Sequence, residues 1–231
     1  MARGTSLSQL RDMLRAELGV SSNLGMGVNT ADQYDHILAR QQQRLWEDFD
    51  WPFGFIERDE QLQNDGRYYT FDNDIDHNRI VSAHVKYGDI WHPLEYGICP
   101  DHYNEFDSDE NETSEPALRW RHYEGNQFEV WPVPSTSDQI LRFRAVKKLP
   151  PLFENSHTAV LDDNLIVLFA AAELLARTKA DDAPPKLAQA TQLYNKLKGN
   201  GMKDNRFIYG GGISTGERIR YIGGRAVRYD R

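Results

Sequence analysis

Residues 161–177 form the most apolar stretch of the chain and restrict most strongly what the chain can fold into. Asp162 or Asp163 is suited to cap the start of a helix, because a short side-chain oxygen accepts the free backbone N–H groups of a first turn. Apolar residues then recur at helical spacing: Leu165, Ile166, Val167, Leu168, Phe169, Ala172, Leu175 and Ala176. A helix that is apolar over most of its circumference needs protein on several sides. We therefore expect it to be the central member of a helical layer.

Three further helices are indicated near the two ends of the chain. Ser6 with Gln9, and Thr30 with Gln33, have the spacing of capping boxes, and amphipathic stretches follow both pairs. A third stretch of helical period runs from about residue 187 to residue 197. Prolines and glycines mark the limits of these helices: Gly19, Pro52, Pro184, Pro185 and Gly199.

The period changes between residues 53 and 148, where short runs rich in aromatic and β-branched residues alternate with turn signals. Dipeptides such as Asp65-Gly66 and Gly88-Asp89 are typical of hairpin turns. The strands are expected at 55–62, 68–71, 80–87, 90–94, 117–124, 127–133 and 139–146. This number of short strands favours a small antiparallel sandwich or barrel.

The order of these elements predicts the fold class. We expect an α+β protein with an antiparallel four-helix core, an inserted small all-β domain and an extended C-terminal arm. The N-terminal half of the core would cover residues 1–52 and the C-terminal half residues 151–201. The β domain would cover residues 53–150, and the arm residues 202–231.

The charge of the chain is unevenly distributed. The formal net charge is −8, yet the residues after Met202 include seven basic and three acidic ones and so carry +4, which leaves −12 for residues 1–202. An acidic body argues against a nucleic-acid binder that uses its whole surface. The basic residues of the arm are interleaved with apolar ones: Arg206, Phe207, Ile208, Tyr209, Ile213, Arg218, Ile219, Arg220, Tyr221, Ile222, Arg225, Val227, Arg228 and Tyr229.

This arm has two interpretations. Its arginines are suited to phosphate contacts on nucleic acid. An extended segment that alternates apolar and basic residues is also suited to docking on another protein, for example by adding a strand to its sheet. A protein partner is favoured, because a pure phosphate binder has no use for the isoleucines.

Residues 105–115 are the most acidic stretch and contain no large aliphatic residue, which is typical of a mobile loop. The loop falls between two predicted strands. Its acidic residues are Glu105, Asp107, Asp109, Glu110, Glu112 and Glu115.

Motifs for catalysis or cofactor binding are weak in this sequence. Gly211 and Gly216 have the spacing of a phosphate-binding loop, but Glu217 and Arg218 replace the required Lys and Ser/Thr, so a flexible linker is favoured. The single cysteine, Cys99, excludes a disulfide framework and a cysteine-rich zinc site. A surface site formed by histidines of the β region (His84, His92, His102 and His122) is left open. We expect no enzyme, no cofactor and no bound metal.

The N-terminus has no signal-peptide core, and the longest apolar run is too short to cross a bilayer, which takes about 18 residues or more. We therefore expect a soluble intracellular product.

The order of the motifs resembles the head-to-tail adaptor (connector) proteins of tailed bacteriophages, especially those of short-tailed, podovirus-like particles. The resemblance covers about residues 5–200, and each motif is weak by itself. The motifs are Ala39-Arg40-Gln41-Gln42-Gln43-Arg44-Leu45-Trp46 leading to Asp50-Trp51-Pro52-Phe53, Trp131-Pro132-Val133-Pro134, Phe143 to Leu149-Pro150-Pro151-Leu152, and Leu174-Leu175-Ala176.

The resemblance implies a structural virion protein that is assembled in the host cytoplasm. Such adaptors form a ring, commonly of twelve copies, beneath the portal protein. The ring extends the channel through which genomic DNA passes without sequence-specific binding, and it provides the attachment site for tail proteins of the nozzle or tail tube. In this family C-terminal arms often reach the portal, so the arm residues named above are expected to bind portal. The acidic loop is expected to line the channel or to dock tail proteins.

Two other classes of function remain as alternatives. A tail-associated hydrolase that degrades peptidoglycan needs a pair of carboxylates in a cleft. A nucleic-acid-binding factor would use the basic C-terminal tail.

Overall fold

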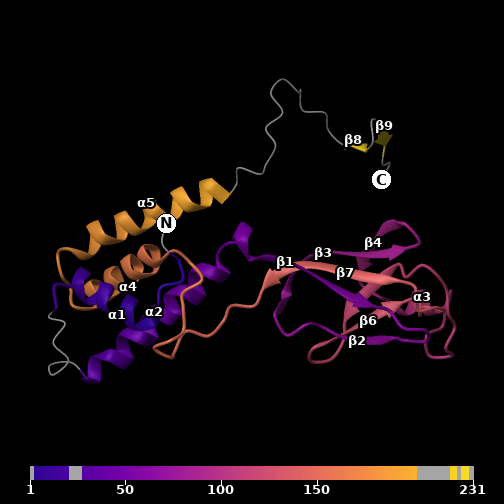
Figure 1. The fold of residues 1–231 in the computed structure, drawn as a ribbon, viewed down its shortest axis with the longest axis horizontal. Coiled ribbons are helices and arrows are strands. Elements are labelled where there is room, and N and C mark those ends of the chain that lie inside the picture. Colours follow the sequence, from indigo (N-terminus) through magenta and orange to yellow (C-terminus); the bar gives the residue numbers. More distant parts are fainter. Residues whose placement is uncertain (1–2, 21–27, 202–218, 223–224, 229–231) are drawn as a thin grey trace.

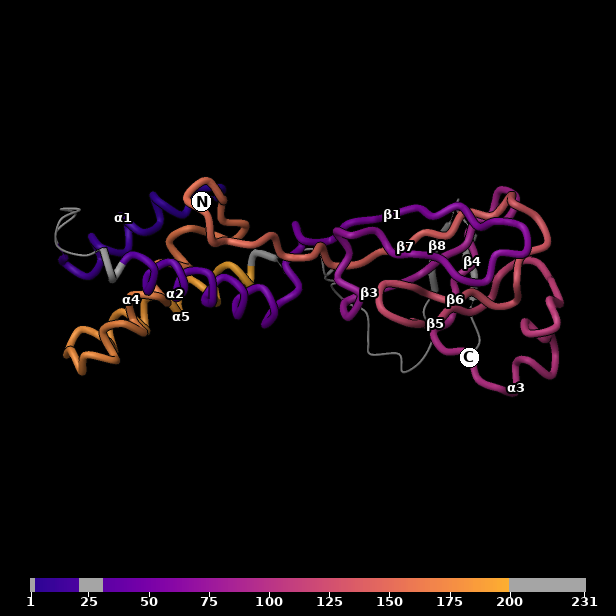
Figure 2. The backbone as a smooth tube through the Cα atoms, turned by 90° about the horizontal axis from the view of Figure 1, so that it is seen from below, coloured from indigo at the N-terminus to yellow at the C-terminus, as the bar shows by residue number. Residues whose placement is uncertain are grey.

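The computed structural model describes residues 3–20, 28–201, 219–222 and 225–228 of the chain. The described part is elongated, with most helices at one end and the main sheet at the other (Figure 1). The view turned by 90° shows the same two ends, joined by a narrow waist of extended chain (Figure 2).

Four helices gather at one end of the molecule: α1 (Leu7–Glu17), α2 (Val28–Glu47), α4 (Asp163–Arg177) and α5 (Ala183–Gly201). Asp162 caps α4, because its Oδ1 accepts a hydrogen bond from the Leu165 N–H at 3.2 Å. Helix α4 packs against α1, α2 and α5, and Leu165, Ile166 and Ala170 of α4 are fully buried. The apolar stretch of the sequence is therefore the centre of this end of the molecule.

The other end is a seven-stranded sheet with the order β1-β7-β3-β4-β5-β6-β2. Its strands are β1 (Phe55–Gln61), β2 (Tyr68–Thr70), β3 (Ile75–Tyr87), β4 (Ile90–Tyr96), β5 (Arg119–His122), β6 (Gln127–Trp131) and β7 (Ile140–Lys147). All neighbours are antiparallel except β4 and β5, which pair in parallel. A second apolar core fills the curve of this sheet, where the rings of Phe71, Phe128 and Phe143 lie in mutual contact.

The waist is fixed by contacts between the end of α2 and the sheet. A short 3-10 turn, η2 (Pro52–Gly54), leads from α2 into β1. A Cβ at Gly54 would lie 2.8 Å from the Trp46 ring, so only glycine fits this approach. The Arg79 guanidinium of β3 donates to the carbonyls of Trp46 and Phe49 at 2.9 and 3.1 Å and so satisfies acceptors at the end of α2.

The predicted fold class is wrong. The described residues contain five α-helices, because α3 (Pro100–Tyr103) was not expected, and the strands form a curled mixed sheet, a half-barrel, instead of a small antiparallel inserted domain. Two features of the strand pairing distinguish the observed sheet from the predicted one. Strand β3 is longer than predicted and pairs with both β7 and β4, and the long connection from β4 to β5 returns the chain in parallel. Turn signals between neighbouring runs indicate hairpins but carry no information on these pairings.

The backbone of the C-terminal segment contains β8 (Ile219–Ile222) and β9 (Arg225–Arg228), which pair antiparallel as a separate two-stranded sheet.

Candidate functional site

The acidic stretch lies in the connection from β4 to β5, at the end of the molecule opposite the helices (Figure 1). The connection begins with α3, whose start is capped because the Cys99 N–H donates to His102 Nδ1 at 2.9 Å. Asp101 follows in the first turn of α3, and the acidic residues 105–115 come after that helix. All six predicted acidic residues therefore belong to one surface loop on the sheet.

The loop has a defined path against the sheet, which differs from the mobile loop that its composition predicts. The Trp131 indole donates to the Phe106 carbonyl at 2.9 Å, and the Ser114 N–H donates to the Val133 carbonyl at 3.0 Å. Ser108, in the middle of the loop, is buried. The composition of the loop could not predict this path, because the groups that anchor the loop belong to other residues, in β6 and directly after it.

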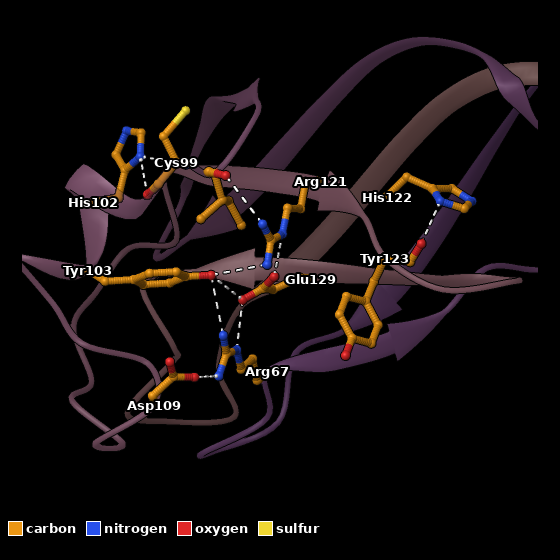
Figure 3. Close-up of polar contacts among 10 residues, drawn as sticks. Arg67, Cys99, His102, Tyr103, Asp109, Arg121, His122, Tyr123 and Glu129 are labelled. Carbon is orange, nitrogen blue, oxygen red and sulfur yellow. Dashed lines mark hydrogen bonds and ion pairs between the residues drawn. The ribbon is translucent and has the colours of Figure 1, made fainter.

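A buried cluster of charged side chains supports this loop (Figure 3). Glu129 of β6 is fully buried, and its two carboxylate oxygens accept hydrogen bonds from Arg67 Nε at 2.7 Å and Arg121 Nε at 2.6 Å. The Tyr103 hydroxyl of α3 donates to Glu129 at 3.0 Å. Arg67 also reaches Asp109 of the loop at 2.5 Å. The cluster thus joins α3 and the acidic loop to strands β5 and β6.

The electrostatics of the cluster keep its arginines charged. Burial lowers the pKa of Arg67, but its hydrogen bonds to Asp109, Glu129 and Tyr103 outweigh burial, so that the pKa is raised well above its ordinary value. For Arg121 the balance is similar, because burial lowers its pKa and the hydrogen bond to Glu129 raises it more. Burial is also the main cause that raises the pKa of the Tyr103 hydroxyl. A carboxylate between two such cations is well compensated inside a protein.

The six acidic residues are not equivalent. Asp109 pairs with Arg67, and Asp107 Oδ1 accepts from the Asp109 N–H at 2.8 Å. Glu112 accepts from the Asp107 N–H at 2.9 Å. The Thr136 hydroxyl donates to Glu115 at 2.6 Å, and this hydrogen bond is the main reason why the pKa of Glu115 is lowered.

Glu105 and Glu110 differ from the other four. Both are exposed, and neither carboxylate has a hydrogen-bond or ion-pair partner within the described part of the chain. Four of the six predicted residues therefore take part in the structure of the loop, and two present unpaired charge to the outside.

The predicted arm residues fall on both sides of the described limits. Arg206, Phe207, Ile208, Tyr209, Ile213, Arg218 and Tyr229 lie outside the described residues. Ile219, Arg220, Tyr221 and Ile222 form β8, and Arg225, Val227 and Arg228 belong to β9. In the hairpin register, Ile219 lies opposite Arg228 and Ile222 lies opposite Arg225.

The sequence analysis missed two neighbouring grooves that share His77 and Asn78. One, of about 600 Å³, lies between α2, the start of β3 and residues 148–153. The other, of about 750 Å³, lies between β3, β4 and β5. His77, His84 and His122 come from separate positions on two strands, and no sequence motif links them.

Two findings limit the chemistry of these surfaces. Within the described ranges, no group of three or more His, Cys, Asp or Glu side chains is arranged to hold a metal ion, although four histidines of the β region had left this possibility open. Burial is the main cause that raises the pKa of two carboxyl groups, Glu60 and Asp163, but Glu60 lies on β1 and Asp163 lies at the start of α4. They sit at opposite ends of the molecule and form no pair.

No helix in the part of the chain that the structure describes has the length and the apolar character to cross a membrane.

Comparison with models of known protein families and with curated proteins found no match to this chain.

Proposed function

We propose that this chain is a structural virion protein, a head-to-tail adaptor of a tailed bacteriophage. In this proposal, copies of the chain form a twelve-membered ring beneath the portal. The ring extends the DNA channel and attaches the nozzle or tail-tube proteins. The resemblance in motif order suggests this class, and the acidic loop is the structural observation that supports it best.

A role of the acidic loop in lining the channel or in docking a tail protein is supported by the hydrogen bonds that hold the loop against the sheet. Glu105 and Glu110 present unpaired negative charge on a loop that the Glu129 cluster holds against the sheet. A fixed surface of negative charge repels the phosphates of passing DNA, and it also offers a firm docking site for a basic partner. A loop without these anchors would move its charges away from either partner.

The composition of the C-terminal segment supports a second contact of the ring, with a protein partner on the side away from the tail. It carries +4 against −12 for the rest of the chain, and it alternates apolar with basic residues. We propose that it is the arm that engages the portal when the ring assembles. The ordering of such a segment on its partner costs free energy, and this cost is offset by the many contacts that an extended segment makes.

The alternative of a peptidoglycan hydrolase needs a pair of carboxylates at one glycosidic bond. The two carboxyl groups whose pKa burial raises, Glu60 on β1 and Asp163 at the start of α4, lie at opposite ends of the molecule and do not form such a pair with each other. The experiment described next also distinguishes the other alternative, a tail that binds nucleic acid.

The test is the mass of the purified chain, measured by light scattering, alone and mixed with portal from the same particle. We expect a ring-sized complex with a fixed ratio of the two proteins, and we expect no complex when residues 203–231 are deleted. The deletion variant should keep the thermal unfolding temperature of the full chain, because both apolar cores lie within residues 7–197.

A full chain that does not bind portal at any ratio would overturn the adaptor proposal. Salt-sensitive binding of the same chain to DNA, lost with the tail, would then favour the nucleic-acid-binding alternative.

A further inference from the structure

An apolar groove lies open at the helical end of the molecule, between α2, α4 and α5, and we call it the α5 groove. It has a volume of about 410 Å³. Its walls are mainly apolar side chains of α4 and of the start of α5: Phe169, Ala172, Ala176, Ala183, Pro184 and Leu187. Leu187 keeps 50% of its surface exposed. A cavity of about 150 Å³ is enough for a benzene molecule, so the α5 groove has room for an aromatic side chain.

Phe153 is an aromatic side chain that is not buried in its own molecule. It keeps 67% of its surface exposed, and no other large apolar residue in the described part of the chain is more exposed. The turn that carries it is fixed, because Leu152 is buried and the N–H groups of Phe153 and Glu154 donate to His157 Nδ1 at 3.3 and 3.2 Å. The ring is therefore held in a defined position outside the core, which limits the entropy that it loses on binding.

Phe153 and the α5 groove lie on opposite sides of α2. Phe153 lies beside one face of this helix, formed by Asp32, Asp35, His36 and Ala39. The α5 groove lies beside Gln41 and Arg44. Successive residues of an α-helix are turned by about 100°, so the two sets point in directions about 160° apart. A contact between two different surfaces joins copies head to tail, and it generates a ring when the rotation closes.

The surface around Phe153 is acidic. Asp32 and Glu154 are exposed, and the nearby Asp35 is already paired with Arg11. The carboxylate of Glu154 has one partner in the described part of the chain, His157, at 3.4 Å. Two exposed carboxylates therefore lie beside the ring and are available to a basic partner.

The border of the α5 groove along α2 and α4 is basic. Arg44 is exposed and lies 5.7 Å from the centre of the Phe169 ring, and no carboxylate of the described residues pairs with it. Arg40 and Arg177 share the single carboxylate of Glu173. At the other end of the groove, the exposed connection to α5 carries one basic and two acidic residues: Lys179, Asp181 and Asp182. The charge that complements the surface around Phe153 is thus at the Arg44 end.

We propose that Phe153 of one copy of this chain binds in the α5 groove of a second copy, with Asp32 and Glu154 toward Arg44 of that copy. The occupant is a second copy because the two surfaces of one molecule face away from each other across α2. An apolar centre inside a charged border is the usual composition of a protein interface. The inference rests on the proposed function for the closed ring, to which it adds the contact between neighbouring copies.

Sedimentation of the free chain over a range of concentrations tests the proposal. We expect the average mass to rise with concentration. Phe153→Asp should weaken the association about thirtyfold or more, because it replaces the aromatic centre of the contact with a charge. Leu187→Asp, on the wall of the α5 groove, should do the same. Tyr96→Asp is the matched control, because Tyr96 is also 67% exposed but lies on β4, and it should leave the association unchanged.

An equal mixture of the two variants tests the head-to-tail arrangement. The Phe153→Asp chain keeps an intact α5 groove, and the Leu187→Asp chain keeps an intact Phe153, so one contact of the proposed kind can form between them. We expect the mixture to form dimers and nothing larger at concentrations where each variant alone is a monomer. Both variants should keep the thermal unfolding temperature of the original chain, because both side chains are exposed.

Three outcomes would overturn the inference. One is an unmodified chain that stays monomeric at every concentration reached. Another is a mixture of the two variants that forms no dimer. The third is association that persists in Phe153→Asp but is lost in Leu187→Asp, which would assign the α5 groove to a different segment or to the same surface of a second copy.

These measurements use the free chain and are therefore separate from the test of the adaptor role. A chain that binds portal but never another free copy would keep the adaptor proposal and overturn this contact. A chain that associates through Phe153 but ignores portal would do the reverse.

Discussion

Glu129 is the residue whose environment matters most to the candidate site. Its side chain has no exposed surface, and every hydrogen bond that compensates its charge comes from outside β6. Arg67 and Arg121 are themselves only partly exposed, at 18% and 33% of their side-chain surface. The three groups are therefore coupled, and the removal of one leaves the others without compensation in a poorly solvated place.

We expect Glu129→Ala to lower the free energy of unfolding by about 3 kcal/mol, because it leaves two partly buried arginines unpaired. Urea denaturation at neutral pH measures the change. Glu105→Ala removes an exposed carboxylate of the same loop and should change the free energy by less than about 0.5 kcal/mol. Similar effects of the two substitutions would mean that the cluster does not support the loop.

At the scale of elements, Glu173 joins helices α2 and α4. The Gln41 amide of α2 donates to Glu173 Oε2 at 2.6 Å, and Arg40 of α2 forms an ion pair with the same carboxylate. Arg177, one turn further along α4, lies at 2.5 Å. Burial raises the pKa of Glu173, but the hydrogen bonds from Arg40, Gln41 and Arg177 outweigh burial, and the pKa is lowered from its ordinary value of 4.5.

This lowered pKa gives the helical end a predictable response to acid. A carboxyl group whose pKa is lower in the folded chain stabilises the fold above its unfolded pKa, and this contribution is lost as the pH falls through the folded pKa. We expect Glu173→Gln to lower the free energy of unfolding at pH 7 by about 1 kcal/mol and to flatten its decrease below pH 4.5.

Thermal unfolding between pH 7 and pH 3 measures this effect, with Glu110→Gln as a control that keeps the slope of the original chain. An unchanged slope in Glu173→Gln would contradict the role of this carboxylate in joining α2 to α4.

At the scale of the whole molecule, the helices lie at one end and the acidic loop lies at the other (Figure 1). The basic C-terminal segment carries +4 against −12 for the rest of the chain. Under the adaptor proposal, the two unpaired carboxylates of the loop face either passing DNA or a tail protein.

We expect the double variant Glu105→Gln/Glu110→Gln to slow DNA release from assembled particles several-fold at low salt, because less negative charge remains to repel the phosphates. Asp181→Asn/Asp182→Asn removes the same charge between α4 and α5, at the helical end, and should leave release unchanged. Unchanged release in the loop variant, with normal attachment of the tail, would exclude a channel role for the loop.

Part of this structure follows from short-range patterns in the sequence. The capped apolar stretch at 161–177 predicts α4, and the runs between turn signals lie close to β1, β4 and β7. Helix caps and strand periods depend on residues a few positions apart, and for this reason a single sequence determines them. The exposed acidic stretch was also visible in the sequence as a candidate site.

The sheet order and the support of the site depend on the tertiary structure. Nothing local in the sequence indicates that β3 pairs with β7 or that β4 runs parallel to β5. Arg67 and Glu129 are 62 positions apart, and each looks like an ordinary surface charge in the sequence. Only the packed sheet brings them together and removes water from the carboxylate. The sequence by itself determined the local elements and the distribution of charge. The three-dimensional pairing of strands decided which charges became structural and which stayed free to meet a partner, because burial and compensation arise only from contacts between distant residues.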